Sequence, residues 1–211
     1  MRKLILILAS AIFFASCTTE VTLTVKPDDS VDIRFEGGAG NAFTKMIASA
    51  SGVAGTTGAA GAGSTDAIID TDTVTYELAR AGFSNVKAEQ KTGGAVLISM
   101  SDKKQSSYIF TSGIVKAEKG RLSAAITRKS LEDFYKSADE QTRMTLDLFL
   151  APVFNDEVMS EDEYLEMVAS FYGNDAAKEV SESVVKINLI SKDGAKETLT
   201  YPLSQIFCGN F

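Results

Sequence analysis

Three closely spaced aspartates, Asp66, Asp70 and Asp72, are candidate ligands for a metal ion. Calcium prefers carboxylate oxygens, and a calcium-binding loop needs them at alternating positions, together with a turn glycine and a bidentate glutamate. Ile68 and Ile69 interrupt that spacing. We therefore expect a structural role, in which Thr71 or Asp72 caps a helix over residues 73–81.

A second acidic group lies later in the chain and comprises Asp156, Glu157, Glu161 and Asp162. These carboxylates could bind a cation, but nothing in their spacing pairs two of them for glycoside hydrolysis. Ser160 and Glu163 match a capping box, and the helix dipole stabilises negative charge in a first helical turn. We therefore predict that a helix begins here, with a cation site as the alternative.

A third acidic group is the pair Asp28 and Asp29, within the segment Pro27-Asp28-Asp29-Ser30. Proline, aspartate and serine are typical turn residues. A metal or acid–base site at this pair would need ligands from distant parts of the chain, and the sequence identifies none. We interpret both aspartates as turn formers.

The chain contains no histidine. This excludes Ser-His-Asp and Cys-His catalysis, and histidine-ligated zinc or haem, within this polypeptide. Gly61 and Gly63 lack the third glycine of a dinucleotide-binding loop, and no glycine precedes the Lys-Ser/Thr pair of a P-loop. Ser-Lys catalysis, paired carboxylates and calcium stay open. We expect no cofactor and favour a non-catalytic protein.

The N-terminus has the features of an export signal. Arg2 and Lys3 precede an uninterrupted run of apolar and small residues from Leu4 to Phe14. This run is too short to span a bilayer, because a transmembrane helix needs roughly 20 apolar residues.

The segment from Phe14 to Cys17 resembles the signal of bacterial lipoproteins, which has an apolar core, two small residues and then a cysteine. Phe14 stands where leucine is usual, whereas Ala15, Ser16 and Cys17 match. The resemblance implies cleavage between Ser16 and Cys17, and acylation of Cys17 by a thioether-linked diacylglycerol and an amide-linked chain such as palmitate. Several acyl chains together give stable membrane anchoring. An ordinary secreted signal with a coincidental cysteine is the alternative.

The same resemblance predicts the location of the protein. In lipoproteins of bacteria with two membranes, an aspartate directly after the acylated cysteine commonly retains the protein at the inner membrane. Thr18 occupies that position here. The resemblance therefore implies a cell-envelope protein that lipid attaches to the membrane. In a host with two membranes this is the outer membrane rather than the inner one, and the protein faces the periplasm or the cell surface.

The chain has two cysteines, and acylation of Cys17 leaves Cys208 without an intramolecular disulfide partner. Cys208 follows Leu203, Ile206 and Phe207, so we expect it to be a small buried side chain on an apolar face. A reactive or intermolecular thiol is the alternative, although no basic neighbour in the sequence would lower its pKa.

The predicted elements place these residues in an α+β fold. Four pairs of alternating segments predict β-hairpins, and they enclose turns at residues 27–30, 91–94, 118–120 and 193–194. We expect an antiparallel sheet of about eight strands with helices packed against it. The longest helix is predicted over residues 131–149, with Ser130 as its cap and Pro152 just beyond its end. Further helices are predicted from Glu161 to Gly173 and from Asp175.

We divide the chain into a signal peptide over residues 1–16, a lipidated tether over 17–20 and a single domain over 21–211. Within the domain we predict a short helix near Phe43 and a mobile Gly/Ala-rich loop over residues 52–64, since glycine has high backbone entropy and alanine packs little surface. The alternative for this loop is a flap that contacts a partner or the membrane.

The negative net charge of the mature chain bears on which kinds of partner it can bind. Loss of Arg2 and Lys3 from the 21 basic residues leaves 19 against 28 acidic ones, a net charge of −9. No basic run follows Lys3, so we expect no nucleic-acid partner. We favour a non-catalytic, lipid-anchored envelope protein that binds or organises another envelope component. The alternative is a histidine-free hydrolase or small-ligand carrier in the periplasm, which would need a deep apolar pocket with convergent polar groups.

Overall fold

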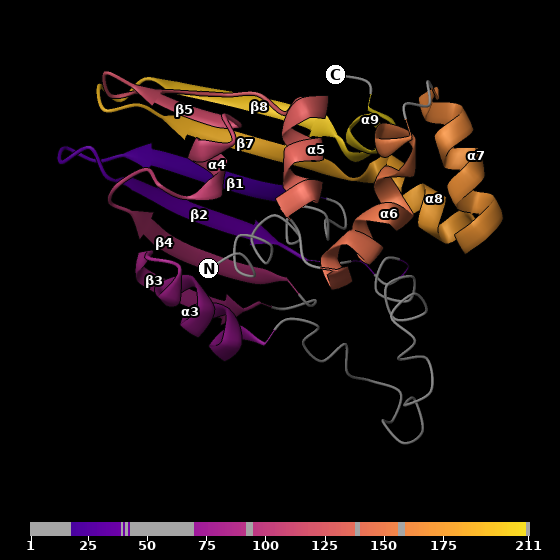
Figure 1. Cartoon of the computed structure of the whole chain (residues 1–211), viewed down its shortest axis with the longest axis horizontal. Helices are drawn as coiled ribbons and strands as arrows, with labels where there is room; N and C mark the ends of the chain where they lie inside the picture. Colours follow the sequence, from indigo (N-terminus) through magenta and orange to yellow (C-terminus); the bar gives the residue numbers. More distant parts are fainter. Residues whose placement is uncertain are drawn as a thin grey trace.

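A computed structural model describes residues 18–38, 40, 42, 70–91, 95–137, 140–155 and 159–209 (Figure 1). The elements in chain order are β1 (Thr18–Val25), β2 (Val31–Gly37), α3 (Thr71–Arg80), β3 (Ser84–Gln90), β4 (Val96–Asp102), α4 (Tyr108–Thr111), β5 (Val115–Glu118), β6 (Arg121–Ala124), α5 (Arg128–Ser137), α6 (Glu140–Phe154), α7 (Glu161–Tyr172), α8 (Asn174–Glu182), β7 (Val184–Ile190), β8 (Lys196–Pro202) and α9 (Leu203–Cys208). The α+β class is confirmed.

All four predicted hairpins form, but they do not make one antiparallel sheet. Six strands pair in the order β3-β4-β2-β1-β7-β8, and β5 with β6 makes a separate two-stranded sheet. Strand β1 pairs in parallel with β7, from Thr18 opposite Val184 to Thr24 opposite Ile190. The expectation of a purely antiparallel sheet is therefore wrong. Parallel strands need a long crossover, and the helices between β1 and β7 supply one.

Alternation along the strands buries one face of the large sheet. Leu23, Phe35 and Ile98 point to that face and are fully buried, and Leu146 and Phe149 of α6 pack in the same core. Figure 1 shows α4 and α5 in front of this sheet, and α6 beside its end toward α8. Burial of each such side chain stabilises the fold by roughly 1.5–3 kcal/mol.

Strand β1 begins earlier than the sequence predicted. Thr18 to Glu20 belong to the strand, and Thr19 is fully buried beneath Gly37 of β2. Residues 18–20, which the sequence analysis assigned to the lipidated tether, therefore belong to the strand in the structure. The physical reason is that Thr19 continues the buried alternation of Val21 and Leu23, and threonine has a high strand propensity. Cys17 and the signal segment lie outside the described residues.

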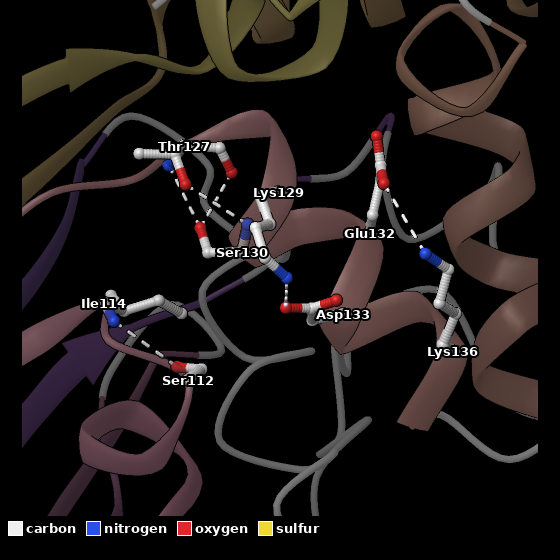
Figure 2. Close-up of polar contacts among 8 residues, drawn as sticks. All are labelled: Ser112, Ile114, Thr127, Lys129, Ser130, Glu132, Asp133 and Lys136. Atoms are coloured by element: carbon white, nitrogen blue, oxygen red, sulfur yellow. Dashed lines mark hydrogen bonds and ion pairs between the residues drawn. The ribbon is translucent and has the colours of Figure 1, made fainter.

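The longest predicted helix is two helices, α5 and α6, in the structure. Ser130 does not cap α5, because the helix begins at Arg128. Figure 2 shows the reciprocal cap: Thr127 N donates to Ser130 Oγ at 3.0 Å, and Ser130 N donates to Thr127 Oγ1 at 3.2 Å. Thr127 is therefore the capping residue, with Ser130 in the first turn.

Pro152 lies inside α6 rather than beyond its end. Proline removes one backbone donor, and this loss is tolerated here in the last turn of the helix. Val153 is in the last turn of α6, where carbonyls have no partner within the helix, and the guanidinium of Arg128 donates to its carbonyl at 2.6 Å. The contact joins the start of α5 to the C-terminus of α6.

Helices α7, α8 and α9 pack against each other beside the end of the sheet where β7 begins (Figure 1). Phe207 of α9 stacks on Phe149 at 5.2 Å, and the hydroxyl of Tyr164 donates to the carbonyl of Phe149 at 2.9 Å. Cys208 is buried in the same place, and its thiol donates to the carbonyl of Gln205 at 3.7 Å. The prediction of Cys208 as a buried side chain is confirmed.

Candidate functional site

The second face of the six-stranded sheet carries mainly polar side chains, and in the described part of the chain no helix packs on it. One row of this polar face crosses all six strands, because the strand register aligns Thr198, Asn188, Thr22, Arg34, Ser99 and Lys87. A second row contains Thr24, Asp32 and Ser101. We call this second face of the six-stranded sheet the polar face.

Hydrogen bonds join the strands across the polar face. Asn188 donates through Nδ2 to Glu20 Oε1 at 2.7 Å, and Thr198 donates through Oγ1 to Asn188 Oδ1 at 2.8 Å. These contacts run from β1 through β7 to β8. They confirm that the side chains point to the same side of the sheet.

A hollow of about 510 Å³ lies on the polar face, toward the β1–β2 turn. The strand residues that line it come from β1, β2, β4 and β3, and residues of the turn and of the loop after β4 complete it. Its charged lining residues are Lys26, Asp28, Asp32, Arg34, Lys87 and Lys103. Its uncharged polar lining residues are Thr22, Thr24, Ser30, Asn85, Ser99 and Ser101.

A chain of polar contacts fixes the floor of the hollow. Asn85 Nδ2 donates to Ser101 Oγ at 3.3 Å, Ser101 Oγ donates to Asp32 Oδ1 at 2.8 Å, and Asp32 Oδ2 lies 3.1 Å from Lys26 Nζ. Ser101 is 5% exposed. Its hydroxyl accepts from Asn85 and donates to Asp32, and these bonds hold it in the floor of the hollow. The constellation therefore does not support a serine nucleophile.

A β-bulge shapes the edge of the hollow. The register of β3 against β4 shifts between Ser84 and Lys87, and Asn85 within the bulge has a positive φ of 55°. Asparagine tolerates this left-handed conformation better than most residues. Bulges redirect side chains and are frequent beside functional sites. Here the bulge turns Asn85 onto Ser101 and leaves Lys87 opposite Ser99.

The β1–β2 turn at the end of the hollow matches the interpretation of Asp28 and Asp29 as turn formers. Asp28 Oδ1 accepts bonds from Ser30 Oγ at 2.6 Å and Ser30 N at 3.2 Å, and these bonds lower the pKa of Asp28. Asp29 has a φ of 64° and lies 2.7 Å from Lys192 Nζ in the β7–β8 turn. Both carboxylates therefore hold turns in place.

The first acidic cluster is also structural where it is described. Asp70 caps α3, since its Oδ1 accepts from Asp72 N at 3.0 Å and Thr73 N at 3.3 Å. The side-chain bond from Thr73 Oγ1 is the main cause of the lowered pKa of Asp70. The prediction of Thr71 or Asp72 as the cap is wrong by one or two residues, and Asp66 lies outside the described residues.

The second acidic cluster contains the predicted capping box. Ser160 N donates to Glu163 Oε2 at 2.8 Å, and Glu163 N donates to Ser160 Oγ at 3.3 Å. Glu161 accepts a bond from Ser204 of α9 at 2.7 Å. Asp156 and Glu157 lie outside the described residues. Within the described ranges no group of three or more Cys, Asp or Glu side chains is arranged to hold a metal ion.

The other predicted site residues, Ser16 and Cys17, and the Gly/Ala-rich loop over residues 52–64 also lie outside the described part of the chain. None of the described helices is both long enough and apolar enough to cross a bilayer. Tyr76 on α3 and Phe171 on α7 are the large apolar side chains exposed among the described residues, and they lie on separate helices.

Comparison with protein-family models, with characterised protein sequences and with solved structures gave no match.

The local sequence patterns do not predict the hollow. Its residues come from two hairpins that are far apart in the chain, and its outline depends on β4 pairing with β2. The available signal was the polar identity of every second position in β1, β2 and β4, such as Thr22, Arg34 and Ser99. That signal predicts an exposed face, but only the strand order brings the three residues into one row.

Proposed function

We propose that the protein is a lipid-anchored, non-catalytic component of the bacterial cell envelope that binds another envelope component through the polar face. The observation that carries this proposal is the contrast between the two faces of the large sheet. One face is filled by an apolar core, and the other presents two hydrogen-bonding rows with a hollow.

Three observations support a binding role over a catalytic one. The chain has no histidine, the hydroxyl of Ser101 is enclosed, and Asp28 and Asp32 are engaged by neighbouring side chains. The lipid anchor rests on the resemblance of residues 14–17 to a lipoprotein signal. Attachment at Cys17 would place the lipid next to the first residue of β1.

A small-ligand carrier is the second candidate, because the volume of the hollow falls within the range of small-molecule sites. Carriers usually enclose their ligand in a mainly apolar cavity. The hollow is instead open and lined by charged and hydroxyl side chains, so we favour contact with a larger envelope component.

Site-specific photo-crosslinking in the native host tests the binding role. A photoreactive phenylalanine analogue replaces Thr24, which lines the hollow on the polar face, and a matched variant carries it at Tyr76, which is 64% exposed on α3. We expect a reproducible adduct from position 24 and none from position 76. Equal adducts from both positions, or no adduct from position 24 and none from a second polar-face position such as Thr198, would refute the proposal.

A further inference from the structure

The lining of the hollow is positive although the chain as a whole is negative. Four cations and two carboxylates line it, which gives a net charge of +2 against −7 for the full chain. Lys26 is paired with Asp32 at 3.1 Å, and Arg34 with Glu36 at 3.0 Å. Among the described residues, no carboxylate lies within 4.0 Å of the ammonium group of Lys87 or Lys103. Two cations therefore remain available to an anionic ligand.

The uncharged part of the lining suits a ligand rich in hydroxyl groups. Thr22 and Ser99 lie in one row with Lys87, and each hydroxyl can both donate and accept a hydrogen bond. Neighbouring strands are about 4.8 Å apart, so this row offers polar groups at regular intervals across the sheet. None of the described residues that line the hollow is aromatic, whereas aromatic anchors are common in protein–protein contacts.

The floor of the hollow is already ordered. The contacts from Asn85 through Ser101 to Asp32 join β3, β4 and β2, and Lys87 lies two residues beyond Asn85 on β3. A preorganised surface loses less entropy when a ligand binds, which favours recognition by polar contacts alone.

We propose that the hollow binds an acidic oligosaccharide. Its carboxylate groups pair with Lys87 and Lys103, and its hydroxyl groups bond to the row that contains Thr22 and Ser99. This inference rests on the proposed binding role of the polar face, and it names the chemical class of the ligand.

Calorimetric titration of the full-length protein in a non-ionic detergent tests this inference. The probes are a tetramer of galacturonic acid and the neutral tetramer of galactose, which differ in charge and share most hydroxyl groups. We expect the acidic tetramer to bind, with an affinity that falls as salt is added, and the neutral tetramer not to bind.

Variants locate the contact. Substitution of Lys87→Gln with Lys103→Gln should weaken binding of the acidic tetramer by at least about tenfold, which corresponds to the loss of about 1.4 kcal/mol. Substitution of Lys87→Arg with Lys103→Arg should preserve binding, because the charge remains. The control variant, Lys116→Gln with Lys119→Gln, removes the same charge from the β5–β6 hairpin and should bind like the wild type.

No binding of the acidic tetramer, equal binding of the neutral one, or equal weakening in the control variant would overturn the inference. If position 24 still gives the expected adduct in the cell, the binding role of the polar face stands and only the ligand class fails. If neither position 24 nor position 198 gives an adduct and the tetramer does not bind, both proposals fail.

Discussion

Tyr164 places a polar hydroxyl group in the core, where the hydroxyl forms a hydrogen bond. The side chain is fully buried, and its hydroxyl donates to the carbonyl of Phe149 at 2.9 Å. Tyr164→Phe removes the donor and leaves a buried carbonyl without that bond, so we expect it to lower the free energy of unfolding by about 1–2 kcal/mol. Urea denaturation measures this loss, with Tyr172→Phe as a half-buried control. An unchanged free energy of unfolding for Tyr164→Phe would show that the hydrogen bond to Phe149 does not stabilise the fold.

The same tyrosine predicts how stability changes at high pH. Burial raises the pKa of Tyr164 well above its ordinary value of 10. The unfolded chain loses this proton near pH 10 and the folded chain does not, so stability is complete below that pH and falls as the pH rises above it. We expect urea denaturation between about pH 9 and pH 11 to show a shallower decline in Tyr164→Phe than in the wild type. Parallel declines would show that Tyr164 ionises freely in the folded protein.

At the scale of single elements, the N-terminus of α7 depends on its capping box. Ser160→Ala removes the oxygen that accepts from Glu163 N, and the loss of such a cap costs about 1 kcal/mol. Thermal or urea unfolding measures this loss. A matched substitution in the same turn, Asp162→Asn, leaves the box intact and should have a smaller effect. A larger effect at Asp162 would mean that the box contributes little to the stability of α7.

The capping box also predicts an acid dependence. Backbone and side-chain bonds from Ser160 lower the pKa of Glu163 from its ordinary value of 4.5. A lowered pKa contributes stability that is present above pH 4.5 and is lost as the pH falls through the folded-state value. In Glu163→Gln the side chain does not titrate, so we expect its unfolding free energy to fall less between about pH 5 and pH 3. An identical fall in both proteins would show that Glu163 does not contribute to the acid dependence of stability.

The contact between Gly37 and Thr19 tests whether β1 is packed at its first residues. A Cβ atom at position 37 would lie 2.9 Å from Thr19 Oγ1 and 3.1 Å from Phe35 Cζ. Gly37→Ala should therefore destabilise the protein by about 1–3 kcal/mol. Adding Thr19→Ala removes the closer clash and should restore part of the loss, as a double-mutant cycle by urea denaturation measures. Strict additivity of the two changes would mean that Thr19 does not pack under Gly37.

The sequence predicts the positions of turns and helix ends closely where a single local feature determines them. The Asp193-Gly194 turn, the Ser160–Glu163 box and the end of α7 at Gly173 have strong local chemistry. The starts of α3 and α5 were misplaced because Asp70 and Thr127 each precede other good capping residues, and only the backbone bonds distinguish them. Both caps are contacts between residues two or three positions apart, but neighbouring residues of similar chemistry offer alternative caps, so residue types alone do not select among them.

At the scale of the whole molecule, the hairpins were predictable and their assembly was not. Alternation within 21–25 and 31–35 indicates that these strands pair, but nothing local indicates that β1 also accepts β7 in parallel. The hollow was missed for the same reason, since Lys26 and Lys87 meet only through the order β3-β4-β2-β1. Contacts distant in the sequence therefore determine the candidate site.

The proposed anchor and the hollow lie at opposite ends of β1. Thr18 begins the strand, and Thr22 and Thr24 line the hollow further along it. The four residue steps from Thr18 to Thr22 span about 13 Å, which exceeds the Debye length of about 8 Å at physiological salt. A lipid on Cys17 would thus be attached more than a Debye length from the nearest lining residue of β1.

The intact mass of the protein purified from the native membrane fraction tests the anchor most directly. We expect the mass of residues 17–211 plus a diacylglycerol and an amide-linked acyl chain, and an unlipidated protein for Cys17→Ala. The unmodified mass of residues 17–211 from wild-type cells, or an uncleaved chain, would contradict the lipid anchor and the cell-envelope function that rests on it.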